Sequence, residues 1–217
     1  MLQSVTNKGM ASYQLLGDIV NSRAVDDRSR LHRDVVGALG AVNAEVSGID
    51  GLDVTVGDEF QGRYRTLGAA LDAALRIRLH LLPRVDVRIG IGYGAVENLE
   101  DTGRLQDGPG WWAAREAIEG VESSARRAGL RSLRTAYRGA AEPATEASVN
   151  AALVCQDQVI GSMPERPVRI LHRLLLGDTQ AAIAADEGVS PSAVSQQVRA
   201  HGIGAILHAH DLLKGMS

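Results

Sequence analysis

The order of hydrophobic patterns over residues 13–91 constrains the fold of this chain more than any other feature. Residues 13–20 form an apolar run of the kind that makes a buried strand. Apolar residues then recur three and four positions apart over residues 31–46, which is the spacing of an amphipathic helix. A second stripe with the same spacing covers residues 67–82 and ends at a proline. The first half of the chain therefore predicts two helices set among strands.

Three further segments have the pattern of strands. Residues 52–56 and 60–64 flank a tight turn at Gly57-Asp58, and residues 85–91 alternate between apolar and polar side chains. With the two helices, these segments give the order β-α-β-β-α-β. That order is the split ferredoxin-like unit, so we expect an α/β fold (α+β, ferredoxin-like) with four or five strands.

The second half of the chain is mainly helical in pattern. A Gly- and Asp-rich loop over 98–110 precedes a predicted helix at 111–128, a possible strand at 130–137 and a helix at 144–161. The character changes after Pro164. We therefore expect two domains, an α/β domain over residues 12–162 and a small all-α domain over residues 166–215.

Composition limits the classes of function. The formal charge is −3, so any contact with nucleic acid must come from a local patch. The single cysteine excludes an internal disulfide and a cysteine-based zinc site. No apolar run approaches the ~20 residues of a membrane span, and the N-terminus lacks the pattern of a signal peptide. We expect a soluble, cytoplasmic protein without membrane contact.

Residues 179–198 have the pattern of a helix–turn–helix, similar to that of sigma-factor region 4. Gly188 takes the turn, Ser190 is placed to cap the second helix, and Pro191 occupies its first position. The pattern predicts DNA binding through a recognition helix at 190–200 that presents Ser192, Ser195, Gln196 and Arg199. The alternative is a helical hairpin that serves dimerisation. Residues 166–217 hold five basic and four acidic residues, a net +1 that is low for contact with phosphates.

Two aspartates lie beside the ends of predicted strands. Asp18 closes the apolar run of the first strand, and Asp58 occupies the hairpin turn. If those strands are neighbours, the two carboxylates converge and need a cation between them, for which Mg²⁺ or Mn²⁺ is suited. The alternatives are an ordinary hairpin turn at Gly57-Asp58 and a helix cap at Asp18.

Four motifs together resemble a known architecture: Gly17-Asp18-Ile19-Val20, Gly57-Asp58-Glu59-Phe60, residues 88–94 and residues 107–115. Their order is similar to that in the palm domain of class III nucleotidyl cyclases and GGDEF diguanylate cyclases. The resemblance is closer to the SatD family, in which such a domain precedes a helix–turn–helix, and it extends over residues 12–213.

The resemblance implies roles for individual residues. Asp18 and Asp58 would hold metal ions on a nucleoside triphosphate, and Arg115 would be the catalytic arginine that stabilises the transferring phosphoryl group. The nucleotide-binding residues would be Ile19, Asn21, Ser22, Arg23 and Trp111. Trp111 also fits a core or interface position, with base stacking as the less favoured role.

The chain departs from the cyclase pattern at three positions. Trp111 stands where cyclases have an asparagine that acts in the transition state, and Val54 stands in place of the lysine that reads the base. Val56 replaces the first glycine of the GGDEF signature. We therefore expect a nucleotide-sensing regulator that binds DNA, and the alternative is a nucleotidyl cyclase or transferase. Palm domains of this type usually pair, so a homodimer is expected.

Two other patterns remain open. The Gly-x-Gly-x-Gly run of residues 90–94 lacks a dinucleotide-fold context, and it indicates a place where a strand or loop passes closely. Five arginines within residues 126–138 have no acids among them, which is typical of a solvated face or of a path for phosphate, RNA or DNA.

Overall fold

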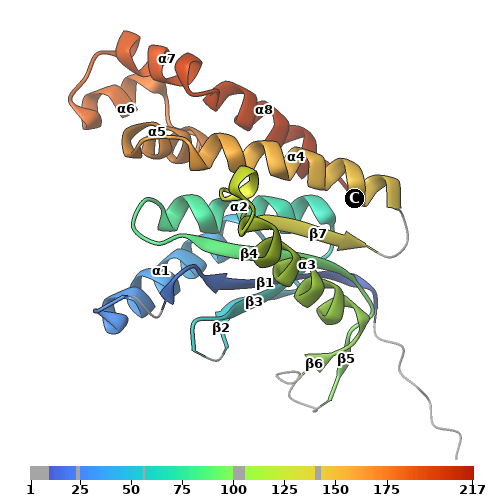
Figure 1. Cartoon of the computed structure of the whole chain (residues 1–217). Coiled ribbons are helices and arrows are strands. Elements are labelled where there is room, and N and C mark those ends of the chain that lie inside the picture. The colour runs from blue at the N-terminus through green and yellow to red at the C-terminus, as the bar shows by residue number, and fades with distance from the viewer. Residues whose placement is uncertain (1–9, 23–24, 56, 100–105, 140–142) are drawn as a thin grey trace, which may run out of the picture.

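The computed structural model describes residues 10–22, 25–55, 57–99, 106–139 and 143–217. Figure 1 shows a mixed α/β molecule in which helices cover both faces of one sheet. The strands are β1 (Ser12–Ile19), β2 (Asp50–Val54), β3 (Phe60–Tyr64), β4 (Val87–Gly94), β5 (Glu97–Asn98), β6 (Gln106–Asp107) and β7 (Thr135–Gly139). The α-helices are α1 (Arg28–Glu45), α2 (Leu67–Leu81), α3 (Pro109–Ala125), α4 (Pro143–Gly161), α5 (Glu165–Leu175), α6 (Gln180–Glu187), α7 (Pro191–Ala200) and α8 (Ile203–Lys214).

The main sheet has the order β2-β3-β1-β4-β7. Strand β1 is antiparallel to both of its neighbours, β3 and β4, whereas β7 is parallel to β4. The predicted β-α-β-β-α-β order is present, and β7 adds a fifth strand at one edge. The expected loop at 98–110 begins and ends instead in a short two-stranded ribbon made by β5 and β6.

The two faces of the sheet carry different helices. Leu15 and Ile19 of β1 belong to the main core with α1 and α2, whereas Leu16 packs with Trp111 and Ala114 of α3. Because successive side chains of a strand point to opposite faces, Asp18 lies on the α3 face. On β4, Ile89 belongs to the main core in the same way, so Arg88 also faces α3. The alternation thus places both charged side chains on one face.

Glycines of β4 allow α3 to lie directly on the sheet. A Cβ atom on Gly90 would come within 2.3 Å of the Ala114 carbonyl oxygen, and one on Gly92 within 2.2 Å of the Ala114 nitrogen. The expected close approach at this run is present, but the approaching backbone belongs to helix α3 and not to a strand or loop.

Helix α4 covers the free edge of β7 with polar side chains. Asp157 accepts hydrogen bonds from the backbone N–H groups of Arg134 and Thr135, both at 2.7 Å. Asn150 both accepts from the N–H of Tyr137 (2.9 Å) and donates to its carbonyl (2.8 Å). These contacts satisfy edge groups that would otherwise be open to another strand, so the sheet ends at β7.

The C-terminal helices pack against α2, which covers one face of the main sheet. Figure 1 shows α4 to α8 gathered above α2, with α6 and α7 on the outer side. Leu75 and Leu79 of α2 share a hydrophobic core with Ile170, Ile183 and residues of α7 and α8. Below it, the buried carboxylate of Asp72 is contacted by Arg76 Nε at 2.6 Å, His210 Nε2 at 3.0 Å and Lys214 Nζ at 3.1 Å.

Helices α6 and α7 follow the predicted local signals. Gly188 ends α6 in the left-handed conformation (φ 65°), and the Ser190 hydroxyl accepts a hydrogen bond from Ala193 N at 3.2 Å.

Among the described residues, none of the helices has the length and apolar character that a membrane crossing requires.

Candidate functional site

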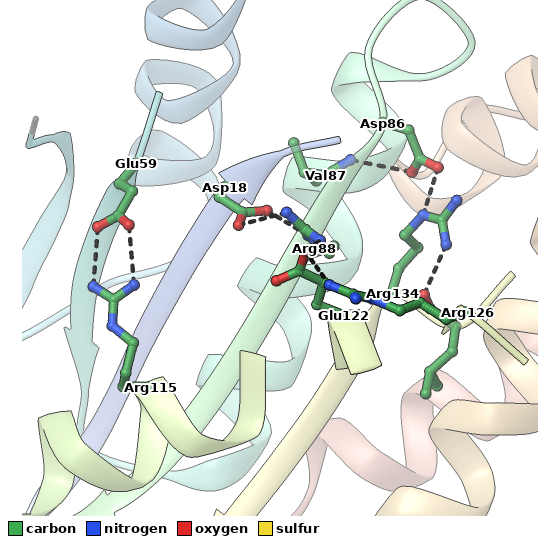
Figure 2. A network of polar contacts seen from close by, with 10 residues as sticks. Asp18, Glu59, Asp86, Val87, Arg88, Arg115, Glu122, Arg126 and Arg134 are labelled. Atoms are coloured by element: carbon green, nitrogen blue, oxygen red, sulfur yellow. Dashed lines mark hydrogen bonds and ion pairs between the residues drawn. The ribbon is translucent and has the colours of Figure 1, made fainter. Parts of the chain in front are cut away.

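Asp18 is held by an arginine from the neighbouring strand. The register of β1 and β4 places Arg88 directly opposite Asp18, and its Nε and Nη2 atoms donate to the two carboxylate oxygens at 2.8 and 3.0 Å. Arg88 Nη1 also lies 3.3 Å from Glu122 of α3 (Figure 2). The hydrogen bonds that Arg88 donates to Asp18 raise the pKa of Arg88, and the charge of Arg88 lowers the pKa of Glu122. The Asp18–Arg88 pair is about one-fifth to one-quarter exposed, with side chains at 24% and 20%.

A second bidentate pair links the hairpin to α3. Arg115 donates to both carboxylate oxygens of Glu59 at 3.0 Å, as Figure 2 shows. These hydrogen bonds raise the pKa of Arg115, so the side chain stays charged. Glu59 directly follows Asp58, so the arginine predicted to be catalytic is tied to the hairpin that carries the second aspartate.

A groove opens at the end of β1; Arg88 lines it, whereas Asp18, Glu59 and Arg115 are not among its lining residues. We call it the β1 groove: its volume is about 560 Å³, and it is lined by Ile19, Asn21, Ser22, Arg28, Asp58, Arg88 and Glu122. Four residues predicted from the sequence therefore lie together here, namely Ile19, Asn21, Ser22 and Asp58. Arg23 lies outside the described residues. Asn21 adopts a left-handed backbone (φ 56°), unusual for a non-glycine residue, and this turns the chain away from β1 into the groove wall.

Asp58 is the uncommitted carboxylate of this region. Within the part of the chain that the structure describes, no hydrogen bond or ion pair engages its side chain, whereas both Asp18 oxygens accept from Arg88. Asp58 also lines a smaller adjoining cavity of about 130 Å³, together with Val54 and His32. It is thus open to a ligand from two sides.

The donor set fits a magnesium ion that arrives with phosphates. Among the described residues, no three His, Cys, Asp or Glu side chains gather as a metal site. Mg²⁺ on a nucleotide, however, commonly needs only one or two carboxylates, with phosphate oxygens and water completing its shell. Asp58 can supply one oxygen as it stands, and Asp18 can supply another when Arg88 turns to Glu122 or to a phosphate.

Trp111 lies in the protein core. Its side chain is 9% exposed and packs with Leu16, Val96 and Ala114 between the sheet and α3. The neighbouring Trp112 is the exposed ring, at 61%, and donates from Nε1 to Asp107 at 2.7 Å. The structure therefore favours the core role of Trp111 over base stacking.

Sequence reasoning missed three residues of the groove: Arg28, Arg88 and Glu122. A signal existed for Arg88, because the alternation of residues 85–91 places it on the opposite side from the apolar residues. Glu122 gave none, since its approach depends on how α3 crosses the sheet. Arg28 is the first residue of α1, just after the capping Asp27. The capping signal predicts where the helix begins, but it does not predict that this helix start lines the groove.

The predicted recognition helix exposes part of its polar face. Ser192, Gln196 and Arg199 are exposed on α7, and Ser195 is half-buried and accepts from Arg199 Nη1 at 2.7 Å. The arginines of α5 are committed to acids: Arg166 and Arg169 pair with Glu187, and Arg173 pairs with Asp178 and Asp186. Little free positive charge therefore remains beside α7.

The arginines of 126–138 are also partly neutralised from other elements. Arg126 pairs with Glu122, Arg134 with Asp86, and Arg138 with Glu146 at 2.5 Å. These acids lie outside residues 126–138 in the sequence. The segment therefore has an excess of positive charge in sequence, and in the fold acids from other elements neutralise part of it. These contacts favour a solvated, ion-paired face.

Comparison with solved structures gives partial similarities to cyclases. Two structures of a bacterial light-regulated adenylyl cyclase match with TM-scores of 0.46 and 0.44 at 15% identity, covering 59% and 58% of this chain. An adenylate/guanylate cyclase/hydrolase from Silicibacter pomeroyi matches with a TM-score of 0.42 at 27% identity over 52% of this chain. The matched regions span 42%, 74% and 70% of those proteins, respectively.

A search of curated proteins found no match. The family comparison is broader, because the SatD family model matches residues 13–214, which includes both the sheet and the C-terminal helices. The chain therefore belongs to the SatD family.

Proposed function

We propose that the β1 groove binds a nucleotide through its phosphates, together with Mg²⁺ or Mn²⁺ held by Asp18 and Asp58. The single observation that carries this proposal is the Asp58 carboxylate, which has no partner among the described residues, in a groove that also holds Arg28, Arg88 and the turn Asn21-Ser22. The cation would offset the repulsion between carboxylates and phosphates.

The other groups of the groove suit phosphate oxygens. Arg28 and Arg88 supply guanidinium donors, which bind phosphates in bidentate fashion. The turn at Asn21-Ser22 brings backbone N–H groups to the same wall, where they can donate to an anion. Ile19 lines the groove at the end of β1, where it would contact the bound nucleotide.

We further propose that the protein is a sensor that acts on DNA through α7, with Ser192, Ser195, Gln196 and Arg199 facing the major groove. These four positions are spaced by three and four residues, so they share one face of the helix. A homodimer would supply the paired recognition helices that such modules use. Because α8 and α5 pack on α2, nucleotide binding would change the pairing of two copies rather than swing the C-terminal helices.

The second candidate is a nucleotidyl cyclase or transferase. Arg115 favours it, since this arginine projects from α3 toward the hairpin of Asp58 and pairs there with Glu59. A guanidinium in that place could stabilise a transferring phosphoryl group. Against it stands Val54, an apolar residue in the cavity beside Asp58.

Incubation with the four ribonucleoside triphosphates and Mg²⁺ or Mn²⁺ separates the two candidates. The sensor hypothesis predicts that mass spectrometry finds the triphosphates intact, while equilibrium dialysis of the same samples detects metal-dependent binding that is lost in Asp18→Asn. A cyclic or oligomeric product that is absent from Asp18→Asn would establish the enzyme instead.

A further inference from the structure

A second cavity lies where the palm meets the C-terminal helices. It has a volume of about 310 Å³, and its polar lining includes Arg78, Asp86, Arg131, Ser132, Arg134 and Glu165. Its walls come from α2, the turn before β4, the segment before β7 and the α4–α5 turn. We call it the junction cavity; its volume lies at the lower end of the ~300–1,000 Å³ usual for small-molecule pockets.

Three guanidinium groups face this cavity against two carboxylates, those of Asp86 and Glu165. Arg134 donates from Nε to Asp86 at 2.6 Å, a pair seen in Figure 2. Arg131 is exposed, and among the described residues its side chain has no acidic partner. The lining therefore contains one cation in excess, and that cation is free to contact a ligand.

Arg78 is the buried member of the set, at 2% exposure. Its Nη1 donates to the buried Asp157. Its Nε has no hydrogen-bond partner, and the nearest carboxylate oxygen of Asp86 lies 3.5 Å away, as an ion pair without a hydrogen bond. A buried donor without a hydrogen bond is destabilising, so an acceptor entering the cavity would relieve this cost.

The two helix ends at the cavity are not equivalent. The last carbonyls of α4 already accept hydrogen bonds, because Ser162 N donates to Gln158 and Val159, and Met163 N donates to Ile160. At the start of α5, Pro164 provides no side-chain cap for the first N–H groups. Pro167 has no N–H, so the donors of the first turn are the N–H groups of Glu165 and Arg166, whereas the last carbonyls of α4 are in use, which favours an anion.

We propose that the junction cavity binds the phosphate group of a small molecule, held by Arg131 with Arg78 and Arg134. The site is separate from the β1 groove in its lining residues, and it needs no metal ion. It lies where palm and C-terminal helices meet, so a ligand there would brace the α4–α5 turn against the start of β7.

Titration calorimetry with inorganic pyrophosphate and, in parallel, with AMP tests this proposal in buffer without divalent cations. Saturable binding of pyrophosphate alone would indicate an inorganic ligand, and binding of AMP would indicate a phosphorylated metabolite. Either outcome supports the site if Arg131→Gln weakens the binding at least fivefold. Arg131 is exposed, so the variant is expected to fold.

Arg127→Gln is the matched control, because it removes the same charge from a neighbouring arginine outside the cavity. It should change the affinity by less than twofold, and Asp58→Asn should leave it unchanged. Absence of binding by either compound, equal losses in Arg127→Gln and Arg131→Gln, or loss in Asp58→Asn would each overturn the proposal. The last result would place the ligand in the β1 groove.

Discussion

The β1 groove and the α2–α8 contact both contain clustered charges, but they use them differently. At the α2–α8 contact, Asp72 is 2% exposed and is contacted by Arg76, His210 and Lys214. At the β1 groove, charged pairs remain partly open to water, and Asp58 has no described partner. Buried charges that are fully paired hold elements together, whereas exposed and unpaired ones retain capacity for a ligand.

The largest effect is expected from Asp72→Ala. The substitution leaves Arg76 and His210 at a buried contact without their shared carboxylate, which should cost about 3–5 kcal/mol of unfolding free energy. Urea denaturation measures the change, with the exposed Asp53→Ala as control. A loss below about 1 kcal/mol would mean that the α2–α8 contact does not depend on this charge.

His172 of α5, which packs against α2, makes the stability of the protein depend on pH. It packs edge-on against His80 with ring centroids 4.4 Å apart, and burial lowers the pKa of His172 to about 4. The unfolded chain therefore takes up a proton at a higher pH than the folded protein, so stability falls as the pH drops from about 6.5 to about 4.

After allowance for partial exposure of the ring, this loss should be about 1–2 kcal/mol. Thermal or urea unfolding between pH 7 and pH 4.5 should show it, and His172→Leu should reduce the slope. An identical slope in the two proteins would show that His172 is not the group that titrates.

Arg88→Gln tests the partly exposed charges of the β1 groove. Removing the guanidinium frees both oxygens of Asp18 and raises the negative charge of the groove, so Mn²⁺ should bind roughly tenfold more tightly, about 1.4 kcal/mol. Calorimetry with Mn²⁺ measures the affinity, and Arg65→Gln provides the same charge change at an exposed site elsewhere. Unchanged Mn²⁺ affinity in Arg88→Gln would remove Asp18 from the proposed ligand set.

The smallest effect is expected from Arg199→Ala. One lost phosphate or base contact should weaken DNA retention by a few-fold, roughly 1 kcal/mol, and reduce the dependence on salt by about one counterion. A gel shift or fluorescence anisotropy series at several salt concentrations measures both. If retention is unaffected, the α6–α7 pair is better explained by dimerisation.

The sequence was sufficient for features that depend on local pattern. The strands β1 to β4, the helices between them and the caps at Gly188 and Ser190 all follow from spacing, turn residues and helix-end signals. The place of Asp18 and Asp58 at neighbouring strand ends follows from the same patterns. Such features need no knowledge of what packs on them.

Features that join distant segments could not be predicted in the same way. Arg88 neutralises Asp18 across 70 positions of sequence, and Asp72 meets His210 across 138. The acids that pair with the arginines of 126–138 also come from other elements. These contacts are fixed by strand register and helix packing, which composition and periodicity do not encode.

The central claim is that Asp58 makes the β1 groove a metal-dependent nucleotide site. Equilibrium binding of nucleoside triphosphates with and without Mg²⁺, compared among the native protein, Asp58→Asn and the control Asp53→Asn, tests it most directly. The account predicts binding that requires Mg²⁺, is at least tenfold weaker in Asp58→Asn, about 1.4 kcal/mol, and is retained in Asp53→Asn. Equal affinity in Asp58→Asn and the native protein would contradict it.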